Sequence, residues 1–266
     1  MVNDKGLITV CSCSTYTINN AVSGHFNQQN DALINGFGLT GNKTTIMSLP
    51  YIDVNPTGEV KAVVIWLHGL GDTGHGFAPM VPELKLPQNL GIRFVFPHAP
   101  MQAVTINNGM QMNAWYDIKS MDMNGRADEA GVIDSSAKIE ALIKAEMAKG
   151  IGAEKIVLAG FSQGGVIALH LSTRFEHKLA GVMGLSTYMC QPQNLAAQKH
   201  SANQQTPFFM AHGQMDDMVP LMAGEQAKSA LVDCGYDVKW QDYPMQHNVC
   251  AQEVNDISSW LQQVLA

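Results

Sequence analysis

One glycine-rich hexapeptide constrains this chain more than any other feature. It is Gly160-Phe161-Ser162-Gln163-Gly164-Gly165, and it lies between apolar runs at 155–159 and 166–171. A Gly-x-Ser-x-Gly sequence between a buried strand and a helix predicts a sharp turn that holds a serine hydroxyl above a sheet. We expect Gly160 and Gly164 to be required because a Cβ at either position would collide with neighbouring backbone. Ser162 is the candidate nucleophile; the alternative interpretation is an ordinary N-cap serine of the following helix.

Apolar runs of strand length recur along the chain and alternate with helical patterns. Predicted strands lie at 61–67, 92–96, 155–159, 179–185, 207–211 and 236–241, and predicted helices at 129–149, 166–171, 222–234 and 251–264. This alternation predicts an α/β fold with a doubly wound, mainly parallel sheet flanked by helices. Further predictions are an edge strand at 45–49, a short helix at 77–86 broken by prolines, a long functional loop at 97–128 and a polar loop at 187–205.

Residues 1–44 differ in composition from the rest of the chain. They contain seven asparagines and show no sustained periodicity, which predicts a flexible or loosely attached N-terminal extension. Residues 45–266 are expected to form one α/β catalytic domain. With 46% hydrophobic residues in a chain of 266, there is enough apolar material for one full-sized core.

Charge and cysteine content exclude several classes of function. A formal net charge of −7 without any cluster of Lys or Arg argues against a nucleic-acid partner. No apolar run approaches the ~18 residues needed to span a bilayer, so stable membrane insertion is not expected. Five cysteines form no metal-binding spacing and leave one unpaired in any disulfide scheme. We therefore expect a cytoplasmic protein.

The candidate base and acid follow from chain order. In folds of this type the serine is followed by an acid and then by a histidine, each on a loop after a strand. Among nine histidines, only His247 follows both a strand and an eligible carboxylate; the alternative is a surface-loop histidine. Asp216 and Asp217 both leave a strand end, and their position alone does not choose between them. The other aspartates of this region, which lie on the last predicted strand or a helix, are Asp233, Asp237 and Asp242.

A second glycine-rich loop supplies candidate groups for stabilising negative charge. The strand at 61–67 is followed at once by His68-Gly69-Leu70-Gly71-Asp72. This is where such folds place a backbone N–H that faces the developing oxyanion. The spacing predicts Leu70 as one donor and Gln163, directly after the serine, as the other. The alternative is an ordinary glycine-rich turn.

From about residue 45 onward the chain resembles the acyl-protein thioesterase/carboxylesterase (phospholipase/carboxylesterase) family of α/β-hydrolases. The matching segments are 67–74, 97–100, 115–117, 160–165, 212–220 and His247. The resemblance selects Asp216 over Asp217 and implies the same oxyanion donors, Leu70 and Gln163. Phe77 departs from the family pattern, which often has tryptophan there, and residues 1–44 have no counterpart.

The resemblance implies a serine hydrolase that cleaves carboxylic esters or thioesters of acyl chains through an acyl-enzyme. Lipids or acylated proteins are the implied substrates, no metal or organic cofactor is needed, and a monomer or homodimer is expected. Methionines near predicted strand ends suit a flexible acyl chain, although core filling is the commoner use of methionine. The candidate substrate-binding residues are Trp115, Met112 and Met218. Alternative functions are a general short-chain carboxylesterase without a protein substrate and a non-catalytic binding module.

Overall fold

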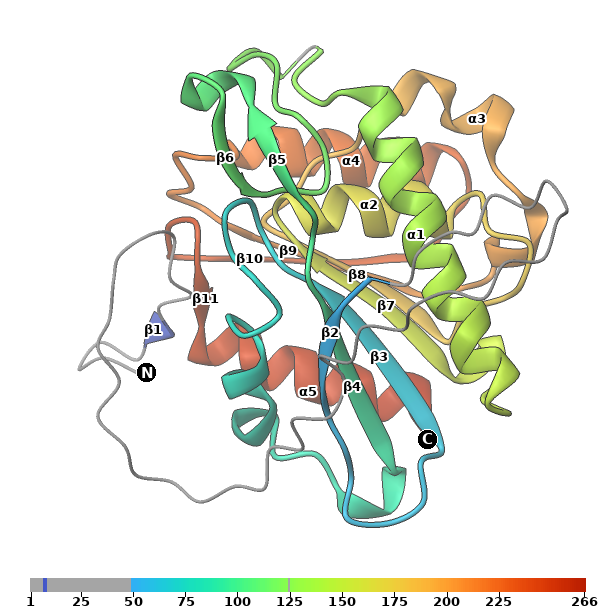
Figure 1. Ribbon diagram of the computed structural model, residues 1–266. Helices are drawn as coiled ribbons and strands as arrows, with labels where there is room; N and C mark the ends of the chain where they lie inside the picture. Colours follow the sequence, from blue (N-terminus) through green and yellow to red (C-terminus); the bar gives the residue numbers. More distant parts are fainter. Residues whose placement is uncertain (1–6, 9–48, 124) are drawn as a thin grey trace, which may run out of the picture.

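The computed structural model describes residues 7–8, 49–123 and 125–266 (Figure 1). Its centre is a seven-stranded sheet with the order β10-β9-β8-β7-β3-β4-β2. The strands are β2 (Tyr51–Val54), β3 (Ala62–Leu67), β4 (Ile92–Pro97), β7 (Ile156–Phe161), β8 (Gly181–Leu185), β9 (Phe208–Gly213) and β10 (Val238–Tyr243). Every neighbouring pair is parallel except β2 with β4. The predicted doubly wound, mainly parallel sheet is confirmed.

Helices cover both faces of this sheet, which explains why its inner strands are continuous apolar runs. Alternate residues of β3 serve two separate cores: Val63 and Ile65 face one, and Val64 and Trp66 face the other. The first core lies beneath α1 (Glu129–Ala148), α2 (Gln163–Ser172) and α4 (Leu221–Asp233). The second lies beneath α5 (Ala251–Leu265) and the 3-10 helix Ala78–Leu84, on the opposite side of the sheet in Figure 1.

Two of the predicted loops contain regular structure. Within 97–128, β5 (Met101–Val104) and β6 (Met110–Asn113) form an antiparallel hairpin. Its turn closes through positive φ angles at Asn108 and Gly109. The segment 187–205 contains α3 (Leu195–Gln198). The remaining short 3-10 helices of the described chain are Gln88–Leu90, Thr105–Asn107, Ala153–Lys155, Pro192–Asn194 and Ser201–Asn203.

Other element predictions need smaller corrections. The edge strand is at Tyr51–Val54, whereas four of the five residues predicted for it, 45–48, lie outside the described residues. The predicted helix at 77–86 is a 3-10 helix with Pro82 inside it; proline lacks the N–H that an α-helix would need there.

The N-terminal segment meets the catalytic part of the chain at one described point. The two-residue strand β1 (Leu7–Ile8) pairs antiparallel with β11 (Val249–Cys250), just before α5. Apart from these two residues, the predicted extension at 1–44 lies outside the described residues, so its flexibility stays a prediction. Across the ranges that the structure covers, no helix is long and apolar enough to cross a membrane.

Candidate active site

Ser162 occupies the turn between β7 and α2 in a backbone conformation that side-chain-bearing residues rarely adopt. Its φ is 52° and its ψ is −118°, a strained combination for any residue except glycine. The turn is tight: a Cβ on Gly160 would lie 2.2 Å from the carbonyl oxygen of Gly164, and one on Gly164 would lie 2.5 Å from that of Leu67. The expected steric need for both glycines is confirmed.

Hydrogen bonds from the neighbouring strand hold this turn in place. The Ser162 N–H donates to the carbonyl oxygen of Leu185 at 2.8 Å, and the Ser162 carbonyl accepts from Thr187 Oγ1 at 2.7 Å. The serine side chain does not cap α2. Its hydroxyl is therefore available to a group above the sheet.

That group is His247, which also contacts Asp216. His247 Nε2 lies 3.0 Å from Ser162 Oγ, and its Nδ1 lies 2.7 Å from Asp216 Oδ2. Because the carboxylate can only accept, Nδ1 carries the proton and Nε2 is left to accept from the serine hydroxyl. Asp217 is exposed to solvent and does not make this contact. The structure thus brings together the serine, histidine and first aspartate singled out in the sequence.

Asp216 is fixed on its other side by its own loop. Asp216 Oδ1 accepts the backbone N–H groups of Met218 at 3.0 Å and Val219 at 2.8 Å. His212 donates from Nε2 to the Val219 carbonyl at 2.8 Å, and burial lowers the pKa of its imidazole. A neutral His212 thus supports the loop that carries Asp216, which we call the acid loop. Sequence analysis had passed over His212 because it precedes the acid along the chain.

The loop after β3 lies directly against the serine. A Cβ placed on Gly69 would be 3.5 Å from the Ser162 Cβ, so this loop approaches the serine closely. His68 holds this loop from within: its Nδ1 donates to the Gly69 carbonyl at 2.7 Å, and its Nε2 accepts the Ala99 N–H at 3.0 Å. Burial lowers the pKa of His68 to about 4, which keeps the ring neutral and both hydrogen bonds intact.

Gln163 contributes more than the backbone N–H that drew attention to it. As the first residue of α2 it has no acceptor within the helix for that N–H. Its buried side-chain amide accepts from the Trp115 N–H at 2.8 Å and donates to the Tyr116 carbonyl at 2.6 Å. This clamp joins the serine turn to the 97–128 segment. No local sequence pattern predicts it, since the two partners are 48 and 47 positions from Gln163.

The three candidate substrate-binding residues occupy different environments. Trp115 is only 1% exposed, and its indole N–H donates to the His68 carbonyl at 2.8 Å, which favours support of the loop over direct contact with substrate. Met112 is partly buried, with its sulfur 3.9 Å from where a Cβ on Gly71 would be. Met218 is 54% exposed on the acid loop.

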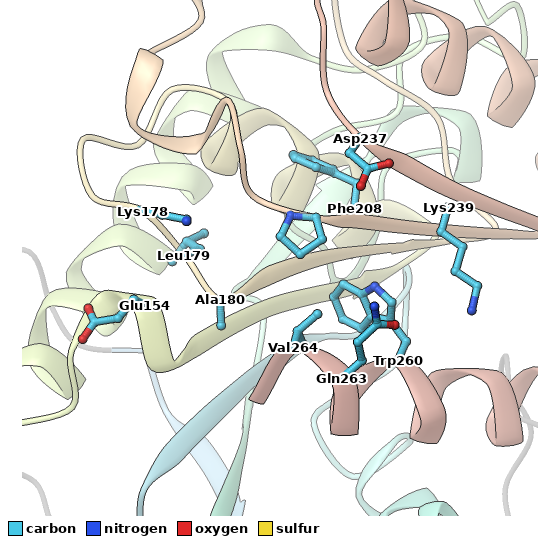
Figure 2. A pocket seen from close by; sticks show the side chains of 11 residues that line it. Glu154, Lys178, Leu179, Ala180, Phe208, Asp237, Lys239, Trp260, Gln263 and Val264 are labelled. Atoms are coloured by element: carbon cyan, nitrogen blue, oxygen red, sulfur yellow. The ribbon is translucent and has the colours of Figure 1, made fainter. Parts of the chain in front are cut away.

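A separate pocket lies near the amino ends of the sheet strands (Figure 2). It has a volume of about 470 Å³ and is lined by residues at the amino ends of β8, β9 and β10, by Glu154 before β7, and by Trp260, Gln263 and Val264 of α5. Ser162, Asp216 and His247 instead follow the carboxyl ends of β7, β9 and β10. The pocket is therefore distinct from the candidate site. Among the residues that the structure describes, no cluster of three His, Cys, Asp or Glu side chains is arranged to hold a metal.

Comparison with known proteins places this chain in a family. Residues 52–265 match the sequence model of the phospholipase/carboxylesterase family. Acyl-protein thioesterase 1 of Neurospora crassa is 41% identical over 209 residues, covering 75% of this chain and 85% of the relative. The same-named protein of Yarrowia lipolytica is 37% identical over 219 residues, covering 80% and 96%.

A solved structure gives the same answer for the fold. The crystal structure of acyl-protein thioesterase 2 from Zea mays has a TM-score of 0.73 and 28% identity, covering 82% of this chain and 99% of that one. The chain therefore belongs to the phospholipase/carboxylesterase family of α/β-hydrolases, and it is a serine hydrolase that cleaves carboxylic esters or thioesters.

Proposed function

We propose that Ser162 is the nucleophile, His247 the general base and Asp216 the acid of an acyl transfer to water. The observation that carries this is the continuous line of hydrogen bonds from Ser162 Oγ through the imidazole to Asp216 Oδ2. In the first step His247 Nε2 takes the hydroxyl proton while Ser162 Oγ bonds to the carbonyl carbon. Asp216 holds the ring in the required tautomer and stabilises its cationic form.

His247 then acts as an acid to complete the acylation, and as a base again for the attack of water. The protonated His247 gives its proton to the departing alcohol or thiol, and the acyl group stays on Ser162. Water then loses a proton to His247 and attacks the acyl carbon. The bond from that carbon to Ser162 Oγ breaks, His247 returns the proton to Oγ, and the carboxylic acid is released. The N–H groups of Leu70 and Gln163 are proposed to bind the carbonyl oxygen when it becomes negative; one such donor typically contributes ~3–4 kcal/mol.

We propose acyl esters or thioesters of lipids or acylated proteins as the substrates. The names of the relatives from Neurospora crassa and Zea mays support acylated proteins. Exposed methionines on the β5–β6 hairpin and on the acid loop support a flexible acyl chain, because unbranched thioethers adapt to such groups. They are Met101, Met110, Met215 and Met218.

We also propose a cytoplasmic protein that is a monomer or a homodimer. The described cysteines, Cys190, Cys234 and Cys250, carry free thiols, the state that a reducing compartment maintains. Fractionation of cells tests the compartment, and sedimentation velocity distinguishes monomer from homodimer.

A substrate panel tests the function. Wild type, Ser162→Ala and the control Ser229→Ala, an exposed serine on α4, are compared on p-nitrophenyl acetate, butyrate and palmitate and on a palmitoylated peptide. We expect hydrolysis of the palmitoyl substrates by wild type and the control, and none by Ser162→Ala. Activity confined to the acetate and butyrate esters would identify a short-chain carboxylesterase. Activity that survives in Ser162→Ala would refute the mechanism, and a wild type without activity or fluorophosphonate labelling would identify a binding module.

A further inference from the structure

Arg126 is a buried cation that the proposed mechanism leaves without a role. It lies in the 97–128 segment just before α1, is only 5% exposed, and its Nε has no hydrogen-bond partner. Within the described residues it forms no ion pair, whereas Arg93, which is less deeply buried, is paired with Asp53 and Glu146. Enclosing a guanidinium without a carboxylate is costly, so its remaining contacts show what the residue holds.

One of these contacts is with the loop that carries the acid. Arg126 Nη2 donates to the Met218 carbonyl at 3.2 Å, and the Met218 N–H donates to Asp216 Oδ1 at 3.0 Å. Residue 218 is thus held from both sides of its backbone. Its carbonyl is fixed by the guanidinium, and its amide is fixed by the carboxylate that orients His247.

Arg126 Nη1 donates to Met123 Sδ at 3.7 Å within its own segment, and a third contact is with the wall behind the serine turn. The guanidinium carbon of Arg126 lies 5.8 Å from the centre of the Tyr188 ring, and the Tyr188 hydroxyl is 2.9 Å from that of Tyr116. The Tyr116 carbonyl accepts from the Gln163 side chain. Arg126 therefore lies where the acid loop meets the tyrosine pair that backs the nucleophile turn.

We infer that Arg126 is a positioning residue of the active site, which locks the Met218 peptide so that Asp216 presents Oδ2 to His247. The inference rests on the proposed role of Asp216. A neutral side chain of similar length would leave the Met218 carbonyl without its donor and the acid loop free to shift. Misplacement of a catalytic group by about 1 Å is enough to lower the rate roughly 100-fold.

Three variants test this with p-nitrophenyl acetate, a substrate too small to reach far beyond the serine. Arg126→Met removes the charge and the donors, and Arg126→Lys keeps a cation that can reach the Met218 carbonyl. Arg174→Met is the control, since Arg174 donates to the His170 carbonyl at the end of α2, away from the acid loop. We expect kcat to fall about 10- to 100-fold in Arg126→Met with little change in KM, partial recovery in Arg126→Lys, and wild-type kinetics in the control. A raised KM at unchanged kcat would overturn the inference, because it would indicate direct substrate binding.

A double-mutant cycle with Asp216→Asn separates positioning from general damage. If Arg126 acts through Asp216, Arg126→Met should cost less than about 2-fold in the Asp216→Asn background. Rates of fluorophosphonate labelling at Ser162 extend the cycle to slow variants. An equal loss in both backgrounds would overturn the inference. Should Arg126→Met fail to give the wild-type circular dichroism spectrum, Arg126→Lys and Arg126→Gln carry the same cycle. Ser162→Ala is measured alongside as a separate test of the proposed function. If Ser162→Ala is inactive, the proposed function stands, and an additive cycle then contradicts only the role of Arg126.

Discussion

Glu253 lies in the first turn of α5 with its carboxyl group enclosed by protein. The side chain is 0% exposed, and neither carboxyl oxygen has a hydrogen-bond partner among the described residues. Burial raises its pKa from 4.5 to about 8; the nearby Cys250 backbone N–H opposes this rise, and the negative charge of Asp256 adds to it. At neutral pH the group is therefore neutral in the folded protein and ionised in the unfolded chain.

This difference makes stability depend on pH. Between pH 4.5 and pH 8 the folded protein binds one more proton at this site than the unfolded chain, so the free energy of unfolding falls as pH rises. At about 1.4 kcal/mol per pH unit, Glu253 lowers the free energy of unfolding by about 3 kcal/mol at pH 7 and by up to about 5 kcal/mol above pH 8, relative to its value below pH 4.5. Glu253→Gln removes the ionisation and with it this dependence.

Urea unfolding of wild type, Glu253→Gln and the exposed control Glu83→Gln at several pH values measures the effect. Between pH 5 and pH 8 the stability of Glu253→Gln should rise relative to wild type by up to about 4 kcal/mol. Any fixed cost of burying the amide cancels, because only the change with pH is compared. The control should follow wild type. Curves for wild type and Glu253→Gln that stay parallel within about 1 kcal/mol would refute the argument.

Two further substitutions test the geometry of the site. Gly164→Ala places a Cβ 2.5 Å from the Leu67 carbonyl oxygen. We therefore expect the variant to lose at least ~2 kcal/mol of stability and to lose its esterase activity. Thermal unfolding at the same temperature as wild type would contradict this. Trp115→Phe keeps an aromatic ring but removes the donor to the His68 carbonyl, which should cost about 1–3 kcal/mol of stability and lower kcat. Kinetics that change only in KM would instead favour direct contact between Trp115 and substrate.

The elements of the fold that could be predicted were those with a local sequence pattern. Continuous apolar runs located the inner strands, the Gly-x-Ser-x-Gly turn indicated Ser162, and chain order selected His247 from nine histidines. The hairpin β5–β6 was missed because Val104 is the one β-branched residue in its two strands, and a group farther along the chain holds its end. Thr105, at the end of β5, is held by the Asp117 carboxylate through both its N–H and its hydroxyl.

In the candidate site, the features that the sequence did not predict depend on contacts between distant residues. Asp216 and Asp217 are equivalent in sequence position, and only the direction of the side chain distinguishes them: the first points inward to His247 and the second to solvent. Family resemblance had selected Asp216, but local physics had not. The role of the Gln163 amide and the bond from Arg126 to residue 218 span 47 and 92 positions, so no neighbouring residue indicates them.

The unusual backbone of Ser162 has a consequence for when the protein becomes reactive. Its φ of 52° is held by a bond to Leu185 in β8 and by the close approach of Gly164 to Leu67 in β3. The turn can therefore exist only after three strands, separated by long stretches of chain, have been assembled side by side. A newly made or refolding chain should stay inert toward esters until that step. The time at which the serine becomes reactive would then report when assembly of the sheet is complete.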